Sequence, residues 1–133
     1  MSLSDLFLRF GAPLANSRWS WGSTRGDGAV FLRVWTDEMK TVEGRRYVRL
    51  INRQAYEEVP ENLGYAERCA HVEMLTKGAP GYAVLCRAAE PRARSREIAS
   101  FDAQTVFRLG AVAIFDGDEW AEVVERVPVR AIT

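Results

Sequence analysis

The sequence predicts a single α+β domain over residues 1–133, with a curved or barrel-like mixed β-sheet and two or three short flanking helices. Segments with the pattern of strands outnumber those with the pattern of helices, and the two do not alternate as they do in βαβ proteins. With 47% apolar and 27% charged residues, a chain of 133 residues is long enough to bury one core.

A short amphipathic helix is expected first. Four apolar residues from Leu3 to Phe10 follow the i, i+3, i+4, i+7 spacing, and Ser2 is a good N-cap. Gly11 and Pro13 then end the helix.

The next segment predicts a β-hairpin that carries three tryptophans. In "AVFLRVW", residues 29–35, aliphatic side chains alternate with Phe31, Arg33 and Trp35, which makes it the clearest strand of the chain. "GSTRGDG" before it contains a turn signal. Trp19 and Trp21 are two residues apart, so in an extended chain their side chains point the same way.

The remaining elements follow from periodicity. Strands are expected at residues 45–51, 81–88, 97–101 and 105–115, the last of them central and buried because it is apolar on both faces. A helix is expected in "NLGYAERCAHVEMLTKG", where one face carries Leu63, Ala66, Ala70 and Met74. The tail around Trp120 fits either a helix that Asp118 caps and Pro128 ends, or an edge strand.

Composition argues against several classes of protein. The formal net charge is zero, which counts against nucleic-acid binding through a diffuse positive field, although a locally basic groove stays open. Cys69 and Cys86 are isolated, so no zinc site is expected, and two reduced cysteines suit a cytoplasmic protein. The N-terminus lacks the features of a signal peptide, and no apolar run is long enough to span a membrane.

Motifs for catalysis are missing. The sequence has no phosphate-binding loop, no nucleophile elbow and no paired histidines, so we expect no catalytic residue, no metal ion and no cofactor. His71, the only histidine, is interpreted as a helix-surface residue at the core edge, and "FDGDEW" as a turn. One enzymatic alternative stays open, in which Glu67, His71 or Asp37 is a buried acid or base.

Arginines gather in two places. Arg92 and Arg94 lie in the loop "CRAAEPRARSR", which is either simply solvated or contacts phosphates. Arg45 and Arg49 flank Tyr47, a mixture typical of surfaces that hold a nucleic-acid backbone and stack a base. We expect the acidic residues to gather elsewhere, in a group made of Glu57, Glu58, Glu61, Glu119, Glu122 and Glu125.

The tryptophans are expected either to pack in the core or to form a binding surface. Core packing is the commoner fate and suits Trp120. Small polar residues flank Trp19 and Trp21, and Trp35 shares its strand face with an arginine. A cage of these three rings beside Asn16 would suit a flat heterocycle, as in proteins that extrude a base from a helix.

The segments "FGAPLANSRWSWG", "VFLRVWTDE" and "GYAVLCRAA" together resemble the PUA superfamily, which includes the SRA, YTH and EVE domains, and in particular the versions fused to HNH nucleases in modification-dependent restriction proteins. The resemblance implies a PUA-like β-barrel with a pocket for a flipped, modified base. It implies that Trp19, Trp21 and Trp35 form the cage and that Asn16 and Ser20 read the base edge. The expected backbone contacts are Arg18, Arg33, Arg45, Arg49, Arg92 and Arg94.

The restriction proteins differ in carrying a nuclease domain, whose motif this sequence lacks. The expected function is therefore a stand-alone, non-catalytic module that binds DNA or RNA with a modified base, with an effector protein as a second partner and no membrane. The alternative is an oligomerising interaction protein whose tryptophans lie in the core.

Overall fold

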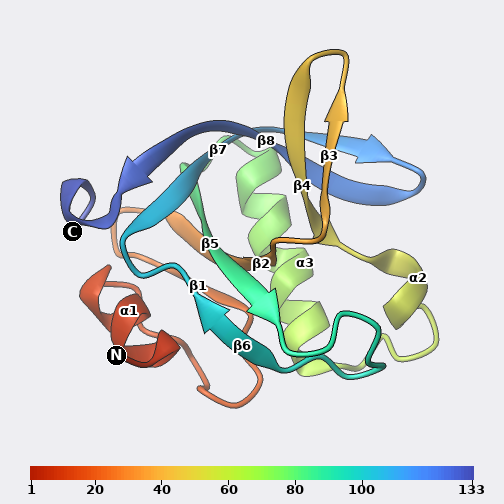
Figure 1. The fold of residues 1–133 in the computed structure, drawn as a ribbon, viewed down its shortest axis with the longest axis horizontal. Helices are drawn as coiled ribbons and strands as arrows, with labels where there is room; N and C mark the ends of the chain where they lie inside the picture. Colours follow the sequence, from red (N-terminus) through yellow and green to blue (C-terminus); the bar gives the residue numbers. More distant parts are fainter.

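The computed structural model describes all 133 residues and has an α+β fold built on a mixed sheet of eight strands (Figure 1). The helices are α1 (Leu3–Arg9), α2 (Arg53–Tyr56), α3 (Leu63–Thr76) and the 3-10 turn η1 (Val129–Ala131). The strands are β1 (Gly22–Thr24), β2 (Val30–Trp35), β3 (Met39–Val42), β4 (Arg45–Ile51), β5 (Gly81–Ala88), β6 (Ile98–Phe101), β7 (Thr105–Phe115) and β8 (Asp118–Pro128). The expected α+β class, with a large mixed sheet and short helices, and most of the expected elements are confirmed.

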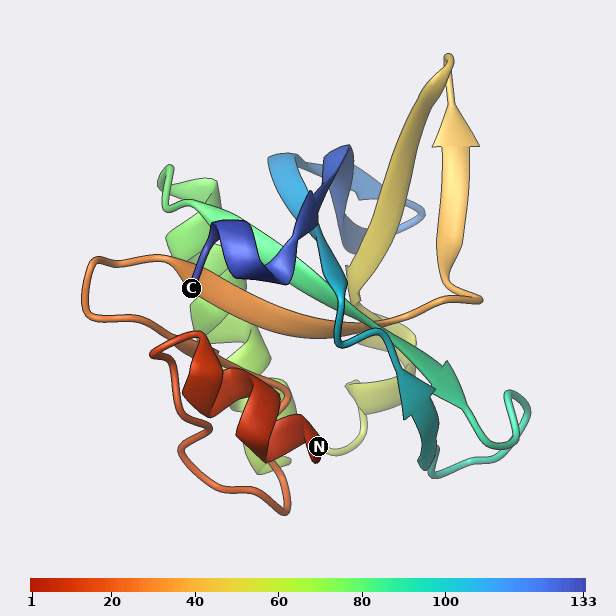
Figure 2. The same cartoon turned by 60° about the vertical axis from the view of Figure 1, so that its left-hand side comes forward.

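The sheet is open. Its strands follow the order β1-β2-β5-β7-β8-β4-β3, with β6 added to the second half of β5, and the end strands β1 and β3 do not pair with each other. The turned view shows the strong curvature of the sheet and the β3–β4 hairpin projecting from the body (Figure 2). β2 and β5 are parallel, with α3 in the connection between them, so the chain contains one crossover that its pattern did not indicate.

Helix α3 covers one face of the sheet, over a core that includes Leu32, Val48 and Leu109. The Asn62 side chain accepts a hydrogen bond from the Tyr65 amide at 3.0 Å and begins the helix. The expected inward face of α3 is wrong, because Leu63, Ala66 and Ala70 are exposed. The buried residues are Gly64, Arg68, His71, Val72 and Leu75. Apolar residues are spread around this helix, so periodicity alone does not select its buried face.

Helix α1 covers the other face, over a second core that includes Phe7, Phe31 and Val84. Its capping box is complete, since Ser2 accepts from the Asp5 amide at 3.0 Å and Asp5 accepts from the Ser2 amide at 2.9 Å. None of the helices combines the length and the apolar character that crossing a membrane requires.

The tail is a long β-hairpin and not a helix. Asp116 and Gly117 both have positive φ, 52° and 82°, as the two-residue turn of a tight hairpin requires. Asp118 therefore begins β8 instead of capping a helix, and Trp120 is buried on a strand. β7 is not buried along its whole length either, because Ile114 near the turn is 70% exposed.

Candidate functional site

The segment Asn16–Trp21 forms a closed loop ahead of β1. The Asn16 carbonyl accepts from the Ser20 amide, and the Asn16 amide donates to Ser20 Oγ, both at 3.0 Å. Asn16 Oδ1 accepts from the Arg18 amide at 2.8 Å. Asn16 and Ser20, the two residues expected to read a base edge, therefore use their side-chain oxygens in hydrogen bonds within the loop. The Asn16 side-chain nitrogen has no hydrogen bond within the chain.

Glu67 of α3 fixes this loop to the helix. Its carboxylate accepts from the Ser20 hydroxyl at 2.9 Å and from the Trp21 amide at 3.0 Å. Gly64, one turn earlier, leaves room for the Trp21 indole, and a methyl group there would also lie 2.7 Å from the Trp19 carbonyl oxygen. Ser20 is only 2% exposed, so its hydroxyl belongs to the packing of the loop.

The aromatic neighbours of Trp21 come from α2 and α3. The centres of the Trp21 and Tyr56 rings are 5.0 Å apart, and Tyr56 stacks on Tyr65 at 5.2 Å. Arg53 donates to the Tyr65 hydroxyl at 2.9 Å and ends this aromatic row. No ring pair in the structure joins two of the tryptophans Trp19, Trp21 and Trp35.

Trp35 lies at the end of β2 and contacts the loop of residues 89–97. The Arg96 guanidinium lies over its ring, 5.3 Å from the ring centre. Two nitrogens of Arg96 donate to the Asp37 carboxylate at 2.7 and 2.8 Å. This ion pair lowers the pKa of Asp37 and holds the arginine-rich loop against the tryptophan.

Arg68 is buried in the middle of this region without a carboxylate hydrogen-bonded to it. Its guanidinium donates to the carbonyl oxygens of Leu50, Trp21 and Arg33 at 2.8, 3.0 and 2.6 Å. Burial, together with the charge of Arg33, lowers its pKa to about 10. Arg68 stays charged near neutral pH and joins α3 to three segments of the sheet.

Arg33 is half-buried, and its guanidinium has neither a hydrogen bond nor an ion pair within the chain. Burial lowers its pKa, and nearby Cys86, Tyr56 and Glu67 partly offset this effect. The buried side-chain nitrogens without a hydrogen-bond partner include Arg49 Nε and Arg68 Nε but none of Arg33. The unpaired guanidinium of Arg33 therefore reaches solvent.

The other expected backbone contacts separate into two groups. Arg45 pairs with Glu122 at 3.4 Å, and Arg49 pairs with Asp118 at 3.4 Å and with Glu38. The acidic residues were expected to gather away from the arginines. This prediction is wrong for Glu122 and for Glu119, because Glu122 pairs with Arg45 and Glu119 with Arg53. The exposed Arg18, Arg92 and Arg94 have no acidic partner.

His71 is not on the helix surface as expected. It is 9% exposed, its Nδ1 has no hydrogen-bond partner, and burial lowers its pKa. No three residues among histidines, cysteines and carboxylates lie together in a group that would hold a metal ion.

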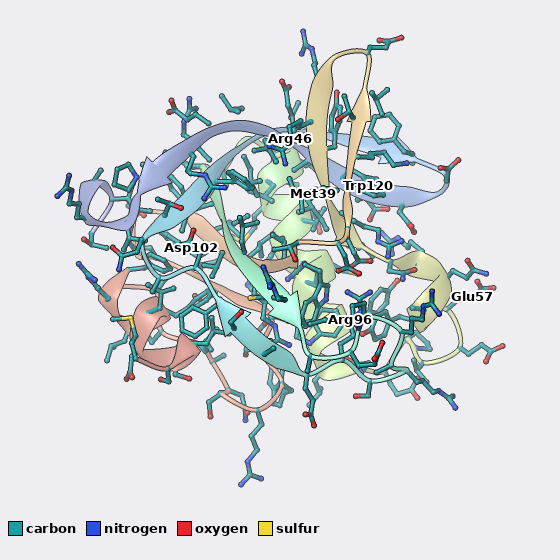
Figure 3. The ribbon with its side chains drawn as sticks, viewed as in Figure 1. Met39, Arg46, Glu57, Arg96, Asp102 and Trp120 are labelled. Carbon is teal, nitrogen blue, oxygen red and sulfur yellow. The ribbon has the colours of Figure 1, made fainter.

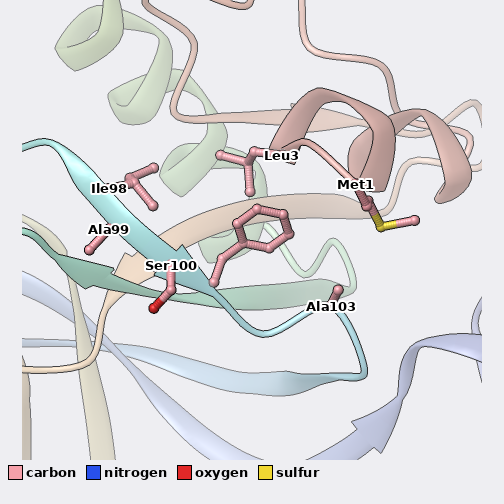
Figure 4. A pocket seen from close by; sticks show the side chains of 7 residues that line it. Met1, Leu3, Ile98, Ala99, Ser100 and Ala103 are labelled. Carbon is pink, nitrogen blue, oxygen red and sulfur yellow. The ribbon is translucent and has the colours of Figure 1, made fainter.

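Two hollows of the surface have no tryptophan in their lining. One, of about 470 Å³, lies between the start of the chain and β6, where Figure 4 shows Leu3 facing Ile98. It is lined by Met1, Leu3, Ile98, Ala99, Ser100, Phe101 and Ala103. The second, of about 360 Å³, is lined by Arg9, Ala103, Gln104, Thr105, Pro128, Val129 and Arg130.

Sequence reasoning missed three residues of the site. Tyr56 falls in the polar stretch before the predicted helix, and Tyr65 lies in that helix but outside its predicted inward face. Arg68 shares the buried face of α3 with Gly64, Val72 and Leu75, a face that periodicity alone does not select in this helix.

Searches against protein-family models, curated proteins and solved structures found no match to this chain.

Proposed function

We propose that this chain is a nucleic-acid-binding module without catalytic activity, which takes a modified base from DNA or RNA onto an aromatic surface. One observation carries the proposal. Four of the arginines that have no acidic partner, Arg18, Arg33, Arg92 and Arg94, belong to the segments that carry or contact Trp19 and Trp35.

These four arginines belong to segments near the aromatic residues, whereas Arg9 and Arg130, which also lack an acidic partner, line a hollow without tryptophans. Arg18 is in the loop that contains Trp19, and Arg33 shares a face of β2 with Trp35. Arg92 and Arg94 are in the loop that Arg96 holds against Trp35. In Figure 3, the labelled Arg96 lies in the lower half of the view. Arg46 and Trp120 lie higher up, beside β3 and β4. Unpaired arginines beside aromatic rings suit phosphate contact combined with base stacking.

In this proposal Trp19, Trp21 and Trp35 provide stacking surfaces, and Tyr56 extends the one at Trp21. The free side-chain nitrogen of Asn16 reads a base edge, while Ser20 acts through the shape of the loop. The same proposal includes a PUA-like fold, with the open sheet as a variant of the barrel. It also includes a cytoplasmic location and an effector protein as a partner. The curved mixed sheet and the free thiols of Cys69 and Cys86 are compatible with it.

Tryptophan fluorescence during titration with short oligonucleotides tests this function. Unmodified, methylated and hydroxymethylated oligonucleotides are compared at low and moderate salt, and one modified form is expected to quench emission selectively. In the R92Q/R94Q double variant, the slope of log K against log salt concentration should fall by about 2, since two phosphate contacts are lost. R45Q is the matched control, because Arg45 is already paired with Glu122.

An absence of quenching at low salt, where phosphate contacts are strongest, would contradict the proposal. The alternative, an oligomerising interaction protein, would then lead. Exposed apolar side chains favour it, among them Met1 (68%), Leu8 (64%) and Ile114 (70%). A concentration-dependent increase in sedimentation coefficient would support that alternative.

A further inference from the structure

Strand β6 has an edge that no other strand covers. One side of β5 pairs with β2, and its other side pairs first with β7 and then with β6. β6 and β7 therefore follow one another along the same side of β5. β8 pairs with β7 as far as Thr105 and Pro128, whereas β6 pairs with β5 alone. The place beside β6 that a longer β8 would occupy is left without a strand.

The chain after β8 turns away from this place. The Val129 amide donates to the Gln104 carbonyl oxygen at 2.8 Å, and the chain then enters the 3-10 turn η1. Arg25 fixes the end of η1, because its guanidinium donates to the Ile132 carbonyl oxygen at 2.7 Å. Figure 1 shows η1 at the far left and β6 lower, to the right of α1. The end of this chain therefore does not complete the sheet at β6.

The backbone at this edge is available for hydrogen bonds. The Asp102 amide donates to the Leu85 carbonyl oxygen at 3.0 Å, so it faces β5. Consecutive residues of an antiparallel strand direct their amides and carbonyls to opposite sides, so those of Phe101 face away from β5. An unpaired strand edge of this kind is a template for a further strand.

An apolar hollow of about 470 Å³ runs along the same edge. All four residues of β6 line it, although successive side chains of a strand point to opposite faces, so the hollow follows the edge of the strand and not one face. Leu3 of α1 faces Ile98 across it (Figure 4). Both residues also pack against the core under α1, which fixes the walls of the hollow. A strand added beside β6 would place apolar side chains here.

A second hollow, of about 360 Å³, adjoins the first and is basic. The two hollows share Ala103, and the second also contains Arg9 at the end of α1 and Arg130 in η1. Both arginines are exposed, and neither has an acidic partner. The neighbouring carboxylate, that of Asp102, already accepts from the Thr105 hydroxyl at 2.7 Å and from two backbone amides. Two unpaired cations therefore lie at one end of the free edge.

We propose that β6 binds an extended peptide of a partner protein as an added strand, with apolar side chains in the first hollow and a carboxylate beside Arg9 and Arg130. The unpaired arginines select an acidic ligand. The strand edge selects a peptide, because the acyl chain of a lipid would leave the backbone groups of β6 unpaired. The inference goes beyond the proposed function and does not depend on it, since no tryptophan lines either hollow.

A second copy of this chain is a poorer occupant of the edge. β6, with the sequence IASF, has no carboxylate to place beside the two arginines. Pairing of β6 with its own copy would also bring the cations of two chains toward each other, which disfavours association.

Fluorescence polarisation with labelled peptides and the intact chain tests the inference. The probes alternate valine and threonine and carry a pair of glutamates at one end, with both ends tried because either strand direction is possible. One glutamate-ended probe should bind. The same probe with lysines in place of the glutamates should bind about tenfold more weakly or worse, because it meets Arg9 and Arg130 with like charge.

Methylation of the peptide amides tests strand addition directly. A strand directs only alternate amides toward one neighbour. Methylation of one alternate set of amides should therefore abolish binding, whereas methylation of the other set should leave most of it. The two methylated peptides have the same composition, so each is the control for the other.

Variants of the chain test the arginines. R9Q/R130Q should lower the affinity for the glutamate-ended peptide about tenfold, and added salt should reduce this difference because the pairs are exposed. R45Q/R108Q is the matched control, because Arg45 and Arg108 are paired with carboxylates elsewhere on the sheet. A103E, which adds a carboxylate between the two hollows and removes no buried atom, should also weaken binding. Urea unfolding midpoints equal to that of the wild type show that each variant is folded.

Several results would overturn the inference. These are a failure of every glutamate-ended probe to bind, equal binding of the glutamate- and lysine-ended probes, equal effects of the two methylation sets, or wild-type affinity in R9Q/R130Q. Displacement of the peptide by dodecanoate at similar concentration would assign the hollow to an acyl chain. A dimer of this chain that excludes the peptide would assign the edge to a second copy.

The oligonucleotide titration separates this inference from the proposed function. If an oligonucleotide displaces the peptide, Arg9 and Arg130 contact phosphates and the inference fails. If oligonucleotides quench tryptophan emission but no peptide binds, the proposed function stands and the inference fails. If the peptide binds as expected and no oligonucleotide does, the peptide site stands and the nucleic-acid function fails.

Discussion

Arginines are accommodated in opposite ways in two parts of this molecule. Along β4 and β8, Arg45 and Arg49 lie against the carboxylates of Glu122 and Asp118. The cations Lys40 and Arg49 also lie over the Trp120 ring, 4.4 and 5.8 Å from its centre. Around the start of α3, by contrast, Arg68 is more deeply buried, and neither Arg68 nor the half-buried Arg33 forms an ion pair with a carboxylate.

The difference follows from how each region is built. β4 and β8 are antiparallel, and Tyr47 lies directly across from Glu122. Arg45, two residues before Tyr47, is on the same face and so comes close to the Glu122 carboxylate. At the start of α3, a helix meets loop and strand ends, where free carbonyl oxygens replace carboxylates as acceptors for Arg68. Ion pairs in the first region range from the exposed pair of Arg45 to the partly buried pair of Arg49. The second region depends on buried polar contacts and is the better candidate for a ligand.

The largest effect in this comparison is expected at Arg68. R68M removes the donor to three carbonyl oxygens, and the loss of these charge-assisted hydrogen bonds, partly offset by removal of a buried charge, should lower the free energy of unfolding by about 3 kcal/mol. Urea denaturation measures this loss, and R68K, which keeps the charge but not the fork, should fall in between. A stability equal to that of the wild type would mean that the carbonyl contacts contribute nothing net.

A smaller effect is expected at Glu67. E67Q removes an anion near the buried Arg68 and turns an acceptor of the Ser20 or Trp21 donors into a competing donor, so stability should fall by about 1–2 kcal/mol. Urea denaturation again provides the measurement. E73Q on the same helix is the matched control, because Glu73 is 66% exposed and pairs only with Lys77. Equal losses in the two variants would remove the distinction between the buried and the exposed charges.

The smallest effect is expected at Arg45, which is 67% exposed. R45Q should change the free energy of unfolding by about 0.5 kcal/mol or less at low salt, and added salt should reduce the difference, because water and ions screen exposed pairs. A thermal unfolding series over increasing salt measures it. A larger loss that is insensitive to salt would show that the β4–β8 pairs are structural in the same sense as Arg68.

Much of the secondary structure could be predicted because its signals are local. The spacing from Leu3 to Phe10 predicted α1, the alternation around Arg33 predicted β2, and an apolar run predicted β7. The tail was left open between helix and strand because both patterns fit, and the positive φ of the Asp116–Gly117 turn decides for a strand. Nothing local indicated that β2 and β5 would pair in parallel.

The candidate site was foreseen in part. The sequence by itself placed Trp19 and Trp21 near Asn16, since these residues are neighbours along the chain. It also determined that arginine would be the main cation available. Only the tertiary structure decided that Arg45 is neutralised by Glu122, 77 residues away, while Arg33 is left without an acceptor. The reason is physical: a charge is paired or free according to strand register and helix packing, which bring distant residues together, and no pattern within one segment encodes that choice.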